Sequence, residues 1–180
     1  MREYFWRAVA YFAAKPDIAN WLVHKSRATP YTDITSADGQ DLYMGRCWLF
    51  NAYSKDANGD PGPARIKWLP SIRIHHICRP YHDRHLHDHP WNARTIILRG
   101  WYREIRMVAY PESGSPMVEV DFPRPTGYTG RLLFGEYHRI TEVSPGGVWT
   151  LFITWKKRGR WGFLKDGVKV YWRTYLGLDQ

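Results

Sequence analysis

Three histidines stand at every second position in His85-Leu86-His87-Asp88-His89, directly before Pro90 and Trp91. Successive side chains of an extended chain point to opposite faces, so these three imidazoles project to the same side. Alternate residues of a strand lie roughly 6.5–7 Å apart, a span that two imidazoles can close around one ion at about 2 Å. Histidine is also the commonest metal ligand in proteins. The segment therefore predicts a metal site, whose remaining ligand must come from elsewhere in the chain.

The segments that must position these histidines are short, rich in β-forming residues and separated by turn residues. Many short strands with frequent Gly and Pro turns favour a sandwich, a jelly roll or a barrel. The expected strands cover residues 31–34, 41–53, 65–78, 84–89, 93–99, 101–110, 117–122, 128–134, 137–143, 148–157, 160–164 and 168–174.

Alternation along two of these strands indicates which face meets a site. Residues 148–155 have an apolar face with Trp149 and Leu151 and a mixed face with Thr150 and Phe152, which suits a barrel wall whose lumen holds a site. In residues 72–78 the neighbouring His75 and His76 point to opposite faces, so at most one of them faces that site.

The N-terminal part differs from the rest. Residues 2–14 and 17–27 are expected to form two short helices, with Pro16 at a first-turn position. Residues 54–64 are expected to be a polar loop, and Lys165-Asp166-Gly167 predicts a hairpin. We expect one domain over residues 1–180, with a helical segment at 1–28 and a β-barrel at 31–174.

Composition limits the class of protein. The chain has 180 residues and is 44% hydrophobic and 16% aromatic, which excludes intrinsic disorder. Cys47 and Cys78 are too few for a disulfide scaffold and fit free thiols in a reducing cytoplasm. No apolar run approaches the roughly 18–20 residues of a membrane helix, so no membrane association is expected.

A formal net charge of +9 favours anionic partners, including anionic metabolites and nucleic acid. The charge is scattered, and its one dense run, Lys156-Lys157-Arg158-Gly159-Arg160, fits a solvated strand end. Nucleic acid is therefore possible but not favoured.

Two motifs resemble those of the cupin superfamily. The first runs Gly-x5-His-x-His-x3/4-Glu-x6-Gly, and His87, His89 and Gly100 meet its spacing, with Ala93 at the Glu position and Tyr81 at the opening Gly. The second runs Gly-x5-Pro-x-Gly-x2-His-x3-Asn. Gly127, Gly135 and His138 meet it, with Leu133 at the Pro and Glu142 at the Asn. The match covers roughly residues 65–164.

The resemblance implies an all-β fold: a cupin-type double-stranded β-helix, or jelly-roll barrel, preceded by the two short α-helices. It implies one divalent metal ion on His87, His89 and His138, without the usual carboxylate because Ala93 cannot ligate. Three neutral imidazoles leave the ion cationic and partly open, which suits Fe(II), with Mn, Ni, Cu or Zn as alternatives. By analogy a homodimer is also expected.

Some thiol dioxygenases of the superfamily use such a three-histidine iron site, so the first expectation is a dioxygenase-type, metal-dependent enzyme. A cationic ion also favours a small anionic substrate. An isomerase or epimerase with histidine and tyrosine as acid and base is the alternative enzyme. The superfamily also contains non-catalytic proteins, which keeps open a binding or regulatory protein with affinity for nucleic acid.

Four further residues are candidates for roles near the metal. His85 could support a ligand, act as an acid or base at the rim, or be a polar residue at the strand entrance. Arg99 could anchor an anion or form an outward ion pair. Tyr102 and Glu104 share a strand face and could enter the barrel as catalytic groups, although cross-strand pairing is the commoner role of a strand Glu.

Overall fold

The computed structural model describes residues 2–36, 38–82, 84–108 and 118–179. Its helices are α1 (Arg2–Ala13), α2 (Pro16–Ser26) and α3 (Trp172–Tyr175). Its strands are β1 (Pro30–Thr35), β2 (Leu42–Phe50), β3 (Tyr53–Lys55), β4 (Pro61–Ala64), β5 (Ser71–Ile77), β6 (Trp91–Arg99), β7 (Tyr102–Val108), β8 (Val118–Arg124), β9 (Thr129–Leu132), β10 (His138–Val143), β11 (Val148–Lys157), β12 (Gly162–Lys165) and β13 (Val168–Tyr171).

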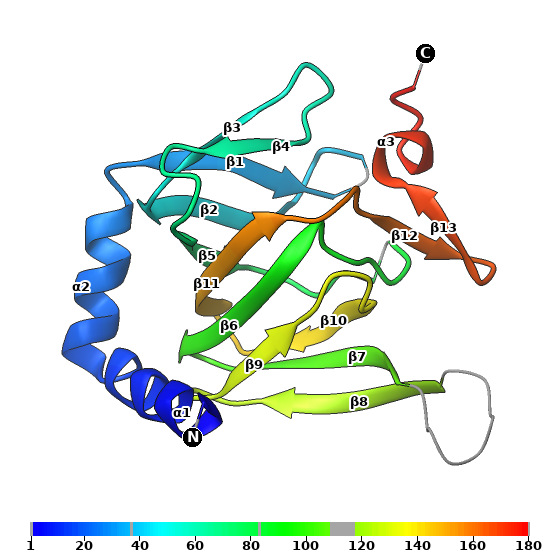
Figure 1. The fold of residues 1–180 in the computed structure, drawn as a ribbon. Helices are drawn as coiled ribbons and strands as arrows, with labels where there is room; N and C mark the ends of the chain where they lie inside the picture. The colour runs from blue at the N-terminus through cyan, green and yellow to red at the C-terminus, as the bar shows by residue number, and fades with distance from the viewer. Residues whose placement is uncertain (1, 37, 83, 109–117, 180) are drawn as a thin grey trace.

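Two antiparallel sheets enclose the interior (Figure 1). The larger has six strands in the order β1-β2-β5-β11-β6-β9, and the smaller has three in the order β10-β7-β8. Buried Ile97 and Val148 of the larger sheet share one hydrophobic cluster with Tyr102 and Ile140 of the smaller. The space between the sheets is therefore partly filled by a hydrophobic core.

The outer face of the larger sheet is covered by α1 and α2 (Figure 1). Ile74 and Leu151 of the sheet form a cluster with Ala10 of α1 and Val23 of α2. Because side chains alternate along a strand, Thr150 and its neighbours of the same parity face the interior. The apolar face of β11 thus packs under the helices, and its mixed face lines the lumen, as the alternation predicts.

Several local expectations are confirmed. The two N-terminal helices lie within a residue or two of their expected bounds. Strands β12 and β13 pair as an antiparallel hairpin. Its turn residues Asp166 and Gly167 have φ angles of 51° and 76°, the left-handed conformation that a tight hairpin turn of this kind needs.

Other local expectations are wrong. The strand expected over 65–78 begins only at Ser71. Residues 54–64 do not form only a loop, because β4 pairs with β3 there. Residues 168–174 do not form one strand, because β13 ends at Tyr171 and the chain turns into α3. The ring of Trp172 stacks on Trp161 with centroids 5.5 Å apart, so tertiary packing accompanies the change of direction.

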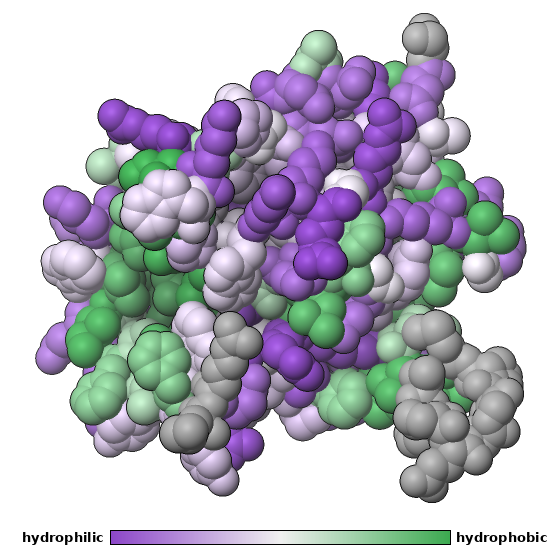
Figure 2. Space-filling view, viewed as in Figure 1, coloured by the Kyte–Doolittle hydropathy of each residue, from purple (hydrophilic) through white to green (hydrophobic). Residues whose placement is uncertain are grey.

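Large apolar side chains are exposed on the helices, and Figure 2 shows hydrophobic residues gathered over that edge of the molecule. They are Tyr4, Phe5, Tyr11, Phe12, Ile18 and Trp21. Within the described parts of the chain, none of the helices has the length and apolar character needed to cross a bilayer.

Candidate metal centre

The histidine segment is extended but is not the expected strand over 84–89. It is held by isolated bridges of His87 to His138 and to Phe163. The amide of His87 donates to the carbonyl of His138 at 3.0 Å, and the amide of His138 donates back at 3.0 Å. Two residues that exchange both hydrogen bonds are direct cross-strand partners, so their side chains lie on the same side. This pairing brings the two distant motifs together.

The structure brings the imidazoles of His87, His89 and His138 together. The ring centroids are 4.8–5.3 Å apart, and one ligand nitrogen from each histidine lies within 4.8 Å of the others. Nε2 of His89 and Nε2 of His138 are 2.9 Å apart. Two nitrogens bound to one ion at about 2.0–2.1 Å and at a right angle are also about 2.9 Å apart. The spacing of these rings fits a metal ion.

Glu104 orients the third histidine from behind. Its Oε2 lies 3.3 Å from Nδ1 of His138, and its Oε1 accepts from Nε of Arg106 at 2.6 Å and from Nε of Arg124 at 2.9 Å. Burial alone raises the pKa of this carboxyl. The hydrogen bond and charge of His138, together with the charges of Arg106 and Arg124, outweigh burial and lower the pKa to about 2.

An ionised Glu104 requires a proton on Nδ1 of His138. This choice leaves Nε2 of His138 free to act as a ligand, and a carboxylate behind a histidine ligand is a common feature of metal sites. Glu104 was a catalytic candidate, but it is fully buried and lies behind His138 rather than on the cavity. Its side-chain contacts are with His138, Arg106 and Arg124.

The surroundings of His87 and His89 favour the neutral imidazole, which is the form that binds metal ions. Burial, followed by the charge of His138, holds the pKa values of His87 and His89 well below the usual histidine value. Nδ1 of His87 is buried and has no hydrogen-bond partner in the part of the chain that the structure describes. A buried nitrogen without a partner costs free energy, which binding to a metal ion would offset. The donor set therefore fits a divalent ion.

The reverse side of the histidine segment is anchored to β12. Asp88 is fully buried, and its Oδ1 accepts the amide of Gly162 at 2.8 Å. Its other oxygen accepts from Nζ of Lys169. Because Asp88 points away from the two flanking histidines, its hydrogen bonds hold the backbone in the extended conformation that keeps both imidazoles on the inner side.

The three histidines line a cavity of about 330 Å³ between the sheets. Tyr81, His75, Arg46 and Arg73 line the same cavity. Alternation along the strand predicts that His75 and His76 lie on opposite faces. In the structure His75 lines the cavity, and the ring of His76 stacks on Trp149 on the other face with centroids 4.1 Å apart. The two arginines were not expected. A cation at position 73, between apolar Ile72 and Ile74, is the signal that could have indicated one of them.

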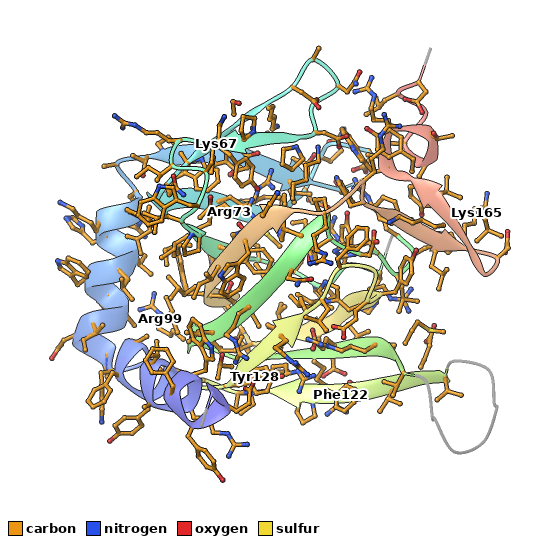
Figure 3. All side chains as sticks on the ribbon, in the orientation of Figure 1. Lys67, Arg73, Arg99, Phe122, Tyr128 and Lys165 are labelled. Atoms are coloured by element: carbon orange, nitrogen blue, oxygen red, sulfur yellow. The ribbon has the colours of Figure 1, made fainter. Side chains whose placement is uncertain are left out.

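The remaining candidates have different positions. His85 is exposed, lies outside the cavity lining, and its Nδ1 lies 2.7 Å from the hydroxyl of Tyr175. Tyr102 lines the cavity, and burial raises its pKa well above 10, so the phenol stays protonated at neutral pH. Arg99 is exposed, lies outside the cavity lining and donates to Oδ1 of Asn20 at 3.1 Å. Figure 3 shows it beside the helices, far from the interior where Arg73 lies.

No family model matches the sequence, and no curated protein sequence is significantly similar to it. Solved structures show partial likeness. The hydroxypropylphosphonic acid epoxidase from S. wedmorenis is 12% identical, with a TM-score of 0.43 over 63% of this chain and 51% of that chain. DMSP lyases give 16% identity and a TM-score of 0.45 over 72% and 57%. A mutant of the Bacillus subtilis oxalate decarboxylase gives 14% and 0.47 over 74% and 30%. The chain spans about half the length of the first two.

Two antiparallel sheets around a lumen, with the paired histidine motifs inside it, define a cupin-type jelly-roll barrel with added helices. Three histidines converge in this lumen. Ala93, at the position where the first motif has Glu, is a buried residue of β6 without a donor atom. The fold class agrees with the expectation from the sequence motifs.

Proposed function

We propose that this protein binds one divalent metal ion through His87, His89 and His138. The observation that carries the proposal is the convergence of the three imidazoles, with Nε2 of His89 and Nε2 of His138 2.9 Å apart. The buried carboxylate of Glu104, which fixes the proton of His138 on Nδ1, supports it. Fe(II) is the favoured ion, because an all-nitrogen site with open positions suits a non-haem iron centre.

We further propose that the protein is a metal-dependent enzyme for a small anionic molecule, with dioxygenase-type chemistry as the leading reaction. When bound, the ion would supply Lewis-acid or redox chemistry next to the substrate. The protein supplies a confined lumen: Phe152 and Tyr81 form part of its wall, and their apolar ring faces exclude water from the reacting groups. Glu104 holds His138 in position throughout.

Metal analysis tests the first proposal. Protein purified without added metal and then loaded with Fe(II), Mn(II) or Zn(II) is expected to hold about one ion per chain, and His138→Ala is expected to hold none. His85→Ala is the matched control: it removes a histidine of the same segment that lies outside the cluster, and it should keep the ion. The proposal is refuted if the parent protein contains no stoichiometric metal as purified and binds none when metal is added.

Oxygen consumption tests the second proposal. Fe(II)-loaded protein is incubated with small mono- and dicarboxylates, with and without a thiol, and O₂ uptake is followed together with substrate loss. We expect uptake with at least one of these anions, and none with His138→Ala. Isomerised product that forms equally after chelation, with no O₂ uptake, would replace the dioxygenase with a metal-free isomerase.

Three broader features remain proposals: one domain over residues 1–180, a homodimer, and a cytoplasmic location. Cys47 and Cys78 are free thiols in the structure, which is consistent with a reducing compartment. Light scattering of the purified chain tests the dimer directly, and a monomer at micromolar concentration would exclude it.

A further inference from the structure

Strand β5 carries a buried cation, Arg73, that the metal site does not use. Arg73 is only 3% exposed, and its side chain lies in the middle of the molecule (Figure 3). In the sheet Arg73 is directly opposite Trp48 of β2 on one side and Phe152 of β11 on the other. Its Cζ is 5.3–5.8 Å from the centroids of five rings, those of Tyr31, Trp48, Tyr53, Trp91 and Phe152.

Within the described part of the chain, this guanidinium has no counter-charge. Among the described residues no carboxylate forms an ion pair with Arg73, and its buried Nε has no hydrogen-bond partner. The ring faces attract the cation, but they offer no acceptors in the plane of the guanidinium. A buried charge is normally paired, so an acceptor from outside the chain is the missing partner.

A second guanidinium lies on the same inner face. Arg46 of β2 is directly opposite His75 of β5, two residues from Arg73 along the strand, and its Cζ lies 4.6 Å from the Tyr31 ring. Burial and then the positive charge of Arg73 lower its pKa to about 10, so Arg46 is still charged at neutral pH. The two cations therefore repel one another across a shared aromatic wall.

The cavity as a whole has an excess of positive charge. Among the described residues, its charged lining consists of the four cations Arg46, Lys55, Arg73 and Arg84 against one carboxylate, Asp33. Asp33 uses Oδ1 to accept the backbone amide of Arg46 at 3.3 Å and forms no ion pair with either guanidinium. A low-dielectric cavity lined by one sign of charge concentrates ligands of the opposite sign.

One aromatic ring connects this cation pair with the histidines. The centroid of Phe152 lies 5.3 Å from Cζ of Arg73 and 5.6 Å from the ring centroid of His89. The same ring stacks on His75 at 4.8 Å. The guanidinium of Arg73 and the imidazole of His89 thus contact the same ring inside one cavity of about 330 Å³, so a small molecule bound to Arg73 can extend toward the histidine cluster.

We propose that Arg73, assisted by Arg46, binds the oxyanion of a small organic substrate, a carboxylate or a phosphate, so that the rest of that molecule reaches the three-histidine cluster. The planar guanidinium offers paired N–H donors that match the two oxygens of either group. The inference gives the proposed enzyme its substrate class and rests on that function for the reaction, but anion binding itself requires no metal.

Ligand-induced thermal stabilisation of metal-free, full-length protein tests the proposal. The probes are propionate, malonate and inorganic phosphate, with neutral propionamide as the uncharged match, and isothermal titration gives the affinities. At least one oxyanion is expected to raise the Tm, whereas propionamide is not. The carboxylate and phosphate arms identify the favoured anion, because stabilisation confined to one of them excludes the other.

Variants locate the binding to Arg73. Arg73→Gln is expected to weaken oxyanion binding by about tenfold or more, because a charge-assisted hydrogen-bond pair is lost. Arg73→Lys should keep a weaker interaction. Arg99→Gln removes an exposed arginine outside the cavity and should bind as the parent does. Should Arg73→Gln fail to fold, Arg73→Lys and Arg46→Gln, each verified by circular dichroism, provide the same comparison.

The outcomes separate this inference from the metal proposal. Arg73→Gln should lose oxyanion binding and keep about one metal ion per chain, whereas His138→Ala should lose the metal and keep oxyanion binding. Parent protein that binds none of the anionic probes, or Arg73 variants that bind them as tightly as the parent, would overturn the inference while leaving the metal result unaffected.

Discussion

The histidine end and the arginine end of the cavity differ in how their charges are balanced. At the histidine end burial holds the pKa values of His87 and His89 low, and the charged groups behind the rings are paired: Glu104 binds Arg106 and Arg124 and accepts from His138. At the arginine end Arg73 is charged, buried and without an ionic partner among the described residues. A metal site needs ligands held in place, whereas an anion site needs a positive potential that the protein itself leaves uncompensated.

The difference also appears in the backbone. Arg73 is in the middle of β5, between two paired strands. The segment from His85 to His89 is outside any strand and is held by bridges and by the buried hydrogen bonds of Asp88. We therefore expect substitutions of Glu104 to lower both stability and metal affinity. Substitution of Arg73 should lower anion affinity but raise the stability of the ligand-free protein.

Glu104→Ala is expected to be the most damaging change to stability. It leaves the partly buried Arg106 and Arg124 without their shared acceptor, and breaking a buried ionic network from one side costs about 3–5 kcal/mol. Urea unfolding followed by tryptophan fluorescence measures the loss. Glu142→Ala, an exposed Glu of the neighbouring strand β10, is the control and should change stability by less than about 0.5 kcal/mol. A loss below about 1 kcal/mol for Glu104→Ala would mean that the network is not stabilising.

Glu104→Gln tests whether the carboxylate orients His138, in a variant that keeps the size of the side chain. The amide keeps the shape of the carboxyl but accepts less strongly from Nδ1 of His138, so metal affinity should fall about 10- to 100-fold. Competition with a chromophoric chelator measures the affinity, and circular dichroism confirms the fold. Unchanged affinity in a folded variant would show that Glu104 does not position the ligand.

Arg73→Gln is expected to change stability in the other direction. Removing a buried charge that has no ionic partner should stabilise the ligand-free protein by about 1 kcal/mol, even though the contacts with five rings are lost. Urea unfolding without added anions gives the value. If the variant is instead destabilised by more than about 1 kcal/mol, Arg73 is a structural anchor of the aromatic cluster.

Arg99→Gln is expected to have the smallest effect. Its hydrogen bond with Asn20 lies on the exposed surface, and such substitutions change stability within about 0.5 kcal/mol. Metal content and oxyanion affinity should equal those of the parent. A clear loss of anion affinity in this variant would show that charge outside the cavity contributes, and would weaken the distinction between the two ends.

Local sequence patterns predicted elements whose structure depends on neighbouring residues. Pro16 at a first-turn position marks the start of α2, and Asp166-Gly167 marks the hairpin, because both depend on backbone preferences within a few residues. The prediction of a loop over residues 54–64 is wrong because it rested on local composition alone. Pairing between β3 and β4 satisfies the backbone of a polar, proline-containing stretch that has no strand pattern of its own.

The position of each candidate site residue depends on which distant residues the fold brings next to it. Alternation placed His75 and His76 on opposite faces, but it could not tell which face was the lumen until α1 and α2 covered one of them. His85 shares parity with His87 and His89, yet it bonds to Tyr175 from α3, a residue 90 positions away. Glu104 could not be assigned to His138 before β7 and β10 were paired.

By itself the sequence determined the all-β class with two leading helices, the three histidines of the candidate metal centre, and the missing carboxylate at Ala93. Each of these depends on residue identity and on short or motif-defined spacing. Only the tertiary structure decided that Glu104 stands behind His138 and that Arg46 and Arg73 share the lumen with the histidines. Burial and the absence of a counter-charge are properties of packing, because they depend on which distant strands close around a side chain.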